Sequence, residues 1–573
     1  MLSALLVPGA AAAISWTVNG IAHKNTSLAV AGAGTAAVLL GLSVTVTPLC
    51  SAVVLLSLGE RVRFHVEHHV LELTTTIPSI THHEDPAAAN RIGLLQDAGR
   101  WRLSASAAAL GDSLRLGLTS TISLFLLASV DPALLLLAVF GVPAVLTRRW
   151  AMARNLRFRT ENAESVRHTS RLFNEASKPA NGLEVRVFGL RTELLRRFST
   201  AHRDVHRADI RMRTIGGLVT TAGRAVFVAA YIAMIALTAL KVREGEASPG
   251  DLAMVIVLGA EVGTIVSDTA TQADLVSQIL HDFSVYGWLI SYAAQQNPAP
   301  DTPANPAAIN SVPTTLVDGI RFEGVTFRYP KSTNDTLKEI DLFLPSGSTI
   351  ALVGDNGSGK STLINLMGRF YEPTEGRITV DGVDIRDFDA ASWREVLSAQ
   401  FQNFTRFEFS LQLSVGVGDL SHLNDAARIT EALTRADADT LAARLPCGLT
   451  TQLGRRWEGG VDLSGGQWQR VALGRALMRT APSLLLLDEP AAALDPETEQ
   501  RLLDRFITEA KTLALKNGGI VVIVSHRFST VRSADVIAVL ENGRIVEYGT
   551  HDQLIASNDR YARMFTLQAS GYR

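Results

Sequence analysis

The sequence STIALVGDNGSGKS, at residues 348–361, decides the fold of the C-terminal part of this 573-residue chain. An apolar segment typical of a buried strand leads into a glycine-rich turn and then into a helical stretch, which is the context that a phosphate-binding P-loop requires. The glycines let backbone N–H groups approach phosphate oxygens, and the helix N-terminus adds partial positive charge. We expect Lys360 to bind the β- and γ-phosphates of a nucleotide and Ser361 to ligate Mg²⁺.

A second segment supplies the acidic groups that nucleotide hydrolysis needs. In SLLLLDEP, at residues 483–490, four leucines predict a strand buried on both faces, with Asp488 at its end. Because open α/β sheets bind ligands at the carboxyl ends of their strands, we expect Asp488 to support Mg²⁺. Glu489 follows directly, and its carboxylate is predicted to polarise the attacking water.

The sequence around these two segments indicates an α/β domain over residues 316–573. Apolar strand-like segments recur there between helical stretches, at residues 320–327, 348–353, 483–488 and 519–525. Residues 296–315 contain five prolines, which disfavour helix and predict an extended linker ahead of this domain.

Residues 1–295 have the composition of a membrane domain. The chain is 47% apolar and only 19% charged, and residues 25–59 contain no Asp, Glu, Lys or Arg, whereas a spanning helix needs only about 20 residues. Five further uncharged runs raise the prediction to six spans: they occupy residues 1–23, 116–130, 132–147, 225–240 and 252–260. We expect residues 1–23 to be a span rather than a signal peptide, since no Lys or Arg precedes the apolar run. The predicted fold is an all-α six-helix transmembrane domain followed by an α/β P-loop domain.

The distribution of charge predicts orientation and partners. Residues 148–213 contain 15 Arg and one Lys against seven acidic residues, so the positive-inside rule puts this loop in the cytoplasm of a multi-pass protein of the cell membrane. The loop at about residues 60–110 and the P-loop domain lie on the same side. The formal net charge of −2 provides no global positive field, so we expect no nucleic-acid partner. Cys50 and Cys447 cannot form a disulfide framework.

Between the P-loop and the acidic segment lies LSGGQ, at residues 463–467, the signature sequence of the ATP-binding cassette (ABC) family. Four other positions resemble family motifs: Tyr329 in FRYP the adenine-stacking aromatic, Gln402 the Q-loop, Asp495 the D-loop and His526 the switch histidine. With six spans ahead of these motifs, the chain resembles a bacterial exporter-type ABC half-transporter. Its nucleotide domain is similar to those of lantibiotic-type peptide exporters.

The resemblance implies ATP and Mg²⁺ as cofactors and Glu489, His526 and Gln402 as catalytic residues. It further implies that Ser361 and Gln402 ligate Mg²⁺ directly while Asp488 supports the ion. The residues implied to bind the nucleotide are Tyr329, Gly354, Asp355, Asn356, Gly357, Ser358, Gly359, Lys360, Ser361, Thr362, Ser464, Gly465, Gly466, Gln467, Asp488 and Asp495. The chain has Ala491 where the family usually has Thr or Ser, a change that removes no catalytic group.

The resemblance also implies a dimer. Ser464 and its glycines offer a second anion-binding helix end, which in the family's fold faces ATP held by the P-loop of another subunit. We expect a homodimer, with a different half-transporter as the alternative partner. The sequence GLEVRVFGLR, at residues 182–191, matches the family's coupling segment, and Arg186, Phe188 and Gly189 are expected to make contacts near Gln402.

The predicted function is ATP-driven export of an amphipathic substrate, such as a peptide, natural product, drug or lipid, by alternating access. An ATP-regulated or importing protein with the same fold is the alternative. Ionisable residues at membrane depth are functional candidates by default, and here they are Asp112, Arg115, Arg224 and Glu261. Asp112 and Arg115 are three residues apart, so simple pairing on one helix face is equally expected. Glu261 is predicted to contact a cationic or amine group of the substrate.

A histidine cluster allows two interpretations. His65, His68 and His69 recur at helical spacing, with His82 and His83 further on, and such a set can bind zinc. The alternative is a polar face of the first cytoplasmic loop, which the lack of a nearby cysteine favours.

Overall fold

The computed structural model of the chain describes residues 3–50, 53, 56–95, 99–161, 163–178, 181–296, 311–490, 518–525 and 531–571. The chain divides into two compact units. The membrane unit combines Met1–Leu73 with Asn90–Ser291, and the nucleotide unit combines Thr74–Ala89 with Tyr292–Arg573. The nucleotide unit therefore includes a short piece of the first cytoplasmic loop, far from the rest of that unit in sequence.

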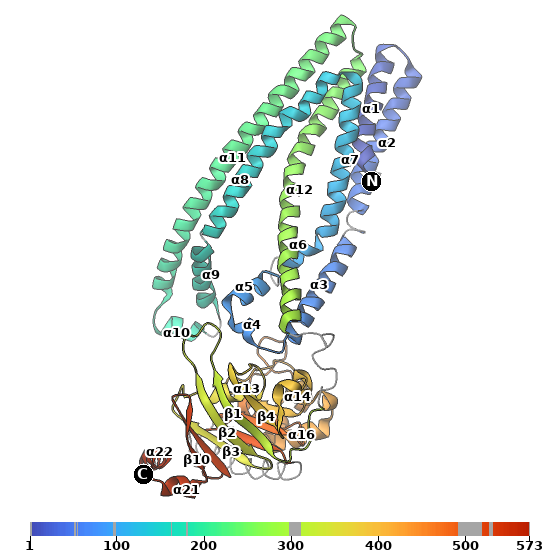
Figure 1. The fold of residues 1–573 in the computed structure, drawn as a ribbon. Coiled ribbons are helices and arrows are strands. Elements are labelled where there is room, and N and C mark those ends of the chain that lie inside the picture. Colours follow the sequence, from blue (N-terminus) through green and yellow to red (C-terminus); the bar gives the residue numbers. More distant parts are fainter. Residues whose placement is uncertain are drawn as a thin grey trace. The chain divides into compact units, whose positions relative to one another are not determined.

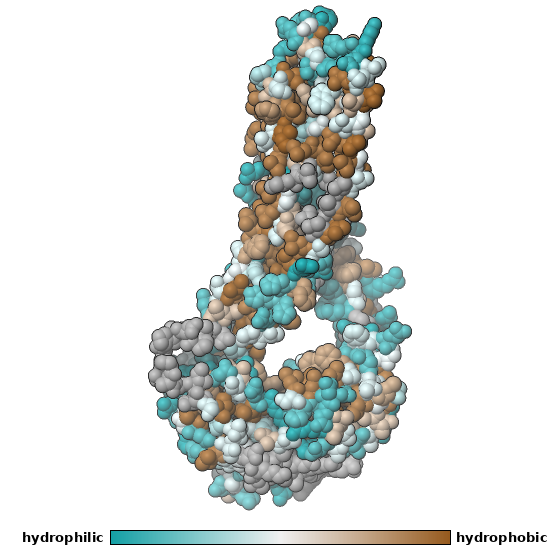
Figure 2. Space-filling model, turned by 90° about the vertical axis from the view of Figure 1, so that its right-hand side faces the viewer, coloured by the Kyte–Doolittle hydropathy of each residue, from teal (hydrophilic) through white to brown (hydrophobic). Residues whose placement is uncertain are grey.

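Six helices in the described part of the chain are long and apolar enough to cross a bilayer, which confirms the predicted number of spans. They are α1 (Ser3–Ala22), α2 (Thr26–Cys50), α7 (Ser106–Val130), α8 (Leu136–Glu161), α11 (Arg191–Glu244) and α12 (Pro249–Gln296). In Figure 1, α8 runs beside α11 and α1 beside α2. On the face drawn in Figure 2, apolar side chains cover much of these helices, as contact with lipid requires.

The two last spans are much longer than their apolar runs. The runs at 225–240 and 252–260 lie inside helices of 54 and 48 residues, and at 1.5 Å per residue the first of these is about 80 Å long. Such helices continue well beyond a hydrocarbon core of about 30 Å. Leu127, Leu137 and Leu258, from α7, α8 and α12, are fully buried in the apolar core of this unit.

Short helices connect the spans. These are α3 (Leu56–Thr76), α4 (Thr81–Glu84), α5 (Pro86–Leu94), α6 (Arg100–Ser104), the 3₁₀ turn η3 (Pro132–Leu135), α9 (Ala163–Ser177) and α10 (Gly182–Val187). A bidentate ion pair from Arg102 to the buried Asp282, with N–O distances of 2.5 and 2.9 Å, ties α6 to α12. Such paired geometry adds orientation as well as energy.

The nucleotide unit contains two sheets. The four-stranded sheet has the order β2-β1-β4-β5 and is antiparallel; the six-stranded sheet has the order β10-β9-β3-β8-β7-β6 and is parallel except for β10. The strands are β1 (Gly319–Phe327), β2 (Leu337–Pro345), β3 (Thr349–Gly354), β4 (Glu375–Val380), β5 (Val383–Asp384), β6 (Leu397–Gln400), β7 (Leu484–Asp488), β8 (Ile520–Val524), β9 (Val536–Glu541) and β10 (Arg544–Gly549).

The helices of this unit pack around these sheets. They are α13 (Lys360–Met367), η5 (Ile385–Asp387), α14 (Ala390–Glu395), α15 (Leu411–Gly416), η6 (Leu420–His422), α16 (Ala426–Arg435), α17 (Asp439–Arg444), η7 (Gly448–Thr450), α18 (Gly465–Ala476), α21 (His551–Ala556) and α22 (Arg560–Gly571).

The central strands are buried on both faces because helices and the second sheet cover them. All five residues of β7 and all five of β8 are buried, which confirms the strand expected from the four leucines. Trp393 is fully buried in the same apolar core as residues of β7 and β8. Its indole N–H donates to the carbonyl of Met367 at 2.9 Å. A buried indole with its donor satisfied stabilises the core without a polar penalty.

Candidate nucleotide site

The predicted site residues follow neighbouring strands of the six-stranded sheet. Strands β3, β8, β7 and β6 are parallel neighbours in that order, so their carboxyl ends meet at one edge. The P-loop follows β3, Glu489 follows β7 and Gln402 comes shortly after β6. The topology thus brings together residues more than 120 positions apart in the sequence, as the ligand-binding edge of an open α/β sheet does.

Glycines shape the P-loop where no other residue would fit. Gly354 has φ +154°, and a Cβ there would lie 2.2 Å from the carbonyl oxygen of Leu540. Gly359 has φ +111°, and a Cβ there would lie 2.6 Å from the side chain of Leu337. The hydroxyl of Ser358 is buried in this loop and has no hydrogen-bond partner in the described residues. A buried hydroxyl that lacks a protein acceptor can donate to a phosphate oxygen, as a phosphate-binding loop requires.

Lys360 is held over this loop. Its ammonium group donates to the carbonyl oxygens of Gly354 and Asp355, each at 2.8 Å, and the side chain is buried. Burial lowers the pKa of Lys360, while the charges of Glu489, Asp488 and Asp355 act in the opposite direction. The lysine is therefore a partly desolvated cation, whose interaction with a phosphate is stronger than it would be in water.

Two of the three residues expected at Mg²⁺, Ser361 and Asp488, are in contact. The hydroxyl of Ser361 donates to the Oδ2 of Asp488 at 3.1 Å. Asp488 is 5% exposed, and burial raises its pKa, against the lowering effect of Ser361 and Lys360. A hydroxyl and a carboxylate oxygen are the hard ligands that Mg²⁺ prefers, so this pair fits the ion.

Glu489 is held by three elements at once. Its amide N–H donates to Val524 at 3.0 Å, its carbonyl accepts from the side chain of Gln469 at 3.3 Å, and its Oε2 accepts from the amide of Gln402 at 2.9 Å. Its φ is +50°, a left-handed conformation that costs a non-glycine residue about 1–3 kcal/mol. Strain of this kind persists where the surroundings over-determine a conformation, and here it fixes the direction of the carboxylate. Because the side-chain amide nitrogen of Gln402 donates this hydrogen bond to Glu489, the side-chain oxygen of Gln402 is the atom left to bind a metal.

The signature sequence forms a capped helix end. Ser464 caps α18: its hydroxyl accepts from the amide of Gln467 at 3.3 Å, and the Gln467 side chain accepts from the Ser464 amide at 2.8 Å. This capping box leaves the amides of Gly465 and Gly466 at the helix N-terminus, where an anion is favoured. Ser464 lies on the helical part of the unit, which has an apolar core of its own around Trp468.

The remaining predicted positions differ in their surroundings. Tyr329 packs edge-on against Phe327 and Tyr371, with ring centroids 4.9 and 5.3 Å away, and its hydroxyl pairs with Thr362 at 3.0 Å. Its stacking on adenine stays a prediction. Ala491, Asp495 and His526 lie outside the described residues, as does most of the proposed linker at 296–315.

The sequence alone did not predict a set of contacts that the first cytoplasmic loop makes. Within the nucleotide unit, Glu84 accepts a hydrogen bond from Tyr371, Asp85 pairs with Lys331, and Arg394 donates to the carbonyl of Pro78 at 2.6 Å. Burial, then the bond to Glu84, raises the pKa of Tyr371. The paired acids next to a proline in THHEDP are the only local signal, and their partners are far away in sequence.

A second missed contact reaches the P-loop from the C-terminus. Arg560, at the start of α22, pairs with Asp355 of the P-loop and with Glu541 at 3.0 Å. No motif marks Arg560, so only the fold reveals this pair.

The predicted coupling segment at residues 182–191 lies in the membrane unit. In and beside α10, Leu183, Val187 and Phe188 are 78%, 77% and 69% exposed, and Arg186 donates to the carbonyl of Gly182 at 2.8 Å. Gly189 has φ +60° and ends the helix. The contacts of this segment near Gln402 stay a prediction.

The histidines do not form a metal cluster in the part of the chain that the structure describes. His69 pairs instead with the hydroxyl of Tyr286 on α12, and His82 is buried within the nucleotide unit, where burial and the neighbouring His83 lower its pKa.

Comparisons with known proteins agree with this geometry. The ABC transporter family model matches residues 337–492. The ATP-dependent lipid A-core flippase of Bordetella pertussis is 31% identical over 73% of this chain and 64% of that protein. The subtilin transport ATP-binding protein SpaT of Bacillus subtilis is 38% identical over 43% of this chain and 39% of that protein. The chain thus spans less than two thirds of the length of these relatives.

A solved structure of a bacterial Atm1-family ABC exporter with ATP bound has the same fold, with a TM-score of 0.77, 23% identity, and coverage of 99% of this chain and 97% of that one. Six membrane-length helices followed by a domain that matches the ABC transporter family model define the architecture: the chain has the fold of an exporter-type ABC half-transporter. It is a multi-pass membrane protein with its nucleotide domain in the cytoplasm.

Proposed function

We propose that two copies of this chain form an ATP-driven exporter of amphipathic substrates. The observation that carries the proposal is the hydrogen-bonded set Ser361–Asp488 and Gln402–Glu489 beside the P-loop, in the same chain as six membrane-length helices. A site able to hydrolyse ATP is thereby joined covalently to a domain able to carry a substrate across a bilayer.

In this proposal the P-loop amides and Lys360 bind the phosphates of ATP. Ser361 and Gln402 would hold Mg²⁺, with support from Asp488, and the ion would neutralise phosphate charge when bound. Glu489 accepts a hydrogen bond from the water that attacks the γ-phosphorus, and the bond to the leaving ADP oxygen breaks as the new P–O bond forms. Asp495 and His526 are proposed for the same site from the family motifs.

The dimer follows from the signature helix. Ser464 and the free N-terminus of α18 form a second anion-binding end, which in the proposal faces the ATP held by the other copy. ATP binding then favours the closed pair, and hydrolysis removes that contribution, so the membrane helices alternate between two openings. A heterodimer with a different half-transporter is the second possibility, since an intact site does not exclude one.

Coupling to the membrane helices uses the cytoplasmic loops. The segment Thr74–Ala89 continues directly from α3. Within the nucleotide unit it contacts the other residues through Glu84, Asp85 and Pro78. The exposed apolar residues of α10 are proposed as the contact of the second loop with the other copy, because exposed apolar clusters on a soluble surface mark interaction sites.

The relatives support the choice of substrate class. One is named a lipid A-core flippase and another a subtilin transport ATP-binding protein, and a lipid is an amphipathic molecule. An ATP-regulated or importing protein is the competing function.

Transport by inside-out vesicles tests the proposal. Vesicles with the wild-type chain are expected to accumulate a fluorescent amphipathic probe upon addition of ATP, and vesicles with Glu489→Gln are not. Probe that leaves preloaded vesicles upon ATP addition would indicate import, and ATP-dependent equilibration without accumulation would indicate a regulated channel.

A further inference from the structure

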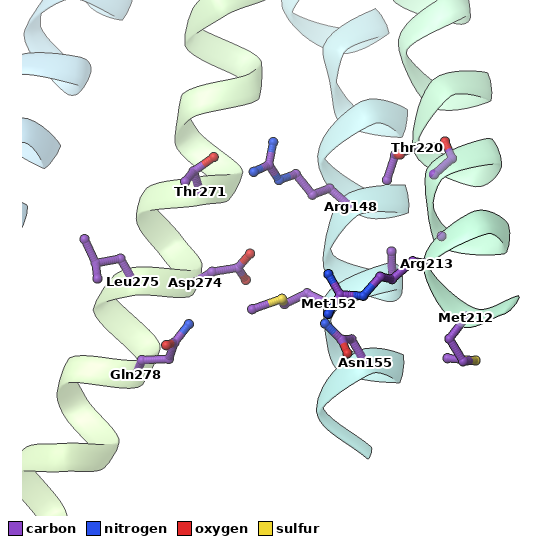
Figure 3. A pocket seen from close by; sticks show the side chains of 13 residues that line it. Arg148, Met152, Asn155, Met212, Arg213, Thr220, Thr271, Asp274, Leu275 and Gln278 are labelled. Carbon is purple, nitrogen blue, oxygen red and sulfur yellow. Dashed lines mark hydrogen bonds between the residues drawn. The ribbon is translucent and has the colours of Figure 1, made fainter. Parts of the chain in front are cut away.

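Two adjoining cavities open between α8, α11 and α12 of the membrane unit, with volumes of about 520 and 550 Å³. They share Arg148 and Thr220 in their walls. The first also has Arg213 and Asp274, shown with Arg148 in Figure 3, and the second has Arg224. The lining thus contains three arginines and one carboxylate.

Arg148 and Arg224 converge on one hydroxyl. Arg224 donates to the Oγ of Ser267 at 2.7 Å, and Arg148 lies 3.5 Å from the same atom. Neither guanidinium has a carboxylate within ion-pair distance among the residues that the structure describes, and the carboxylate of Asp274 in the wall of the first cavity interacts with Arg148 only at longer range. Arg213 differs, because it pairs with Asp209 on its own helix at 2.7 Å. Two guanidiniums that meet at a neutral hydroxyl leave positive charge for a ligand to neutralise.

The position of the pair along the helices indicates the kind of ligand. Arg148 directly follows the uncharged run at 132–147, and Arg224 directly precedes the run at 225–240, so both stand where the apolar part of a helix ends. The walls beside them are apolar and include Phe227 and Tyr231, and the ring of Phe227 packs against the backbone of Gly263 so closely that a Cβ there would lie 2.8 Å away. A charged end and an apolar wall at the membrane boundary match a molecule with an anionic head and a hydrocarbon tail.

We propose that Arg148, Arg224 and Ser267 form a subsite for the anionic head of an amphipathic substrate, a phosphate or a carboxylate attached to an apolar tail. The guanidiniums donate to the head oxygens, and the tail lies along the apolar walls of the second cavity. This inference rests on the proposed function and names the substrate class. It differs from the expectation for Glu261, which lies beside Ala260 on α12 but does not line either cavity.

The experiment uses the full-length protein in nanodiscs of neutral phosphatidylcholine. ATPase activity is titrated with four probes: dodecyl phosphate, dodecanoate, dodecyltrimethylammonium and inorganic phosphate. We expect activity to rise with at least one of the two anionic amphiphiles, and which of them acts identifies the head group. Equal responses to the cationic amphiphile, or to inorganic phosphate without a tail, would overturn the proposal.

Variants then locate the response. Arg148→Gln combined with Arg224→Gln is expected to raise the half-maximal concentration of the active anion about a hundredfold, since the loss of each charged hydrogen bond is worth about tenfold or more. Arg149→Gln is the matched control, because Arg149 is adjacent in sequence but lines neither cavity. Arg224→Lys keeps the charge and is expected to retain the response, which keeps the test valid if the double variant fails to fold.

The outcomes separate the two proposals. A wild-type protein with no more ATPase activity than Glu489→Gln contradicts the proposed function. A wild-type ATPase that ignores both anionic amphiphiles, or a response that the double variant retains or Arg149→Gln loses equally, contradicts the anion subsite alone.

Discussion

The nucleotide unit and the membrane unit hold their functional candidates in opposite ways. In the nucleotide unit, Ser361 contacts Asp488 and Gln402 contacts Glu489, and each of these residues comes from a motif visible in the sequence. In the membrane unit, Arg148, Arg224 and Ser267 meet across three helices with no motif. Chemistry shared by a whole family requires fixed residues at fixed spacing, whereas substrate binding requires only a suitable surface. Four variants can break or sharpen this contrast.

The largest effect is expected from the motif residue Glu489. Glu489→Gln keeps the hydrogen-bonding shape but removes the charge that polarises water, so the ATPase rate constant is expected to fall about a hundredfold or more. Steady-state hydrolysis by purified protein measures the rate, and retained binding of a fluorescent ATP analogue is the control. A variant that turns over at the wild-type rate would contradict the assignment of the base.

The next effect concerns the loop contact that no motif announced. Glu84→Gln with Asp85→Asn removes the charges paired with Tyr371 and Lys331. We expect substrate-stimulated ATPase activity to fall about tenfold while basal activity remains. The reason is that the loop then no longer couples the membrane helices to Tyr371 and Lys331 of the nucleotide unit. Glu60→Gln, at the start of the same loop, is the control. Unchanged stimulation in the double variant would mean that this contact does not couple the units.

A smaller effect is expected from Glu261 in the membrane unit. If it contacts an amine group of the substrate, Glu261→Gln weakens substrate-stimulated ATPase activity about fivefold and leaves basal activity nearly unchanged. Titration with a cationic amphiphile measures the effect, and Asp112→Asn, whose carboxylate lies 3.7 Å from Arg115, is the control. Equal loss of basal and stimulated activity would mark Glu261 as structural.

The smallest effect is expected from Arg560, which reaches the P-loop through Asp355. Arg560→Gln removes a half-exposed ion pair worth about 1 kcal/mol or less, so the Kd for ATP is expected to rise no more than about fivefold. High salt should reduce the difference between wild type and variant, since screening weakens the pair. A difference that persists in 1 M salt would show that Arg560 acts through packing.

Prediction from the sequence succeeded where chemistry or hydropathy constrains neighbouring residues. The six spans were readable because a bilayer demands about 20 apolar residues in a row. The strand at residues 484–488 was readable because four leucines must be buried on both faces. The lengths of α11 and α12 were not readable, because the polar continuation of a helix beyond the bilayer carries no apolar signal.

The sequence by itself determined the class of the nucleotide domain and the number of spans, and it predicted the phosphate-binding and acidic residues, since each depends on residue types at short spacing. Only the tertiary structure decided that Thr74–Ala89 belongs with the nucleotide unit, that Arg560 reaches Asp355, and that Arg148 and Arg224 share Ser267. The physical reason is that these contacts join residues 43 to 316 positions apart. Pairs at such separation leave no local pattern, and folding alone brings them together.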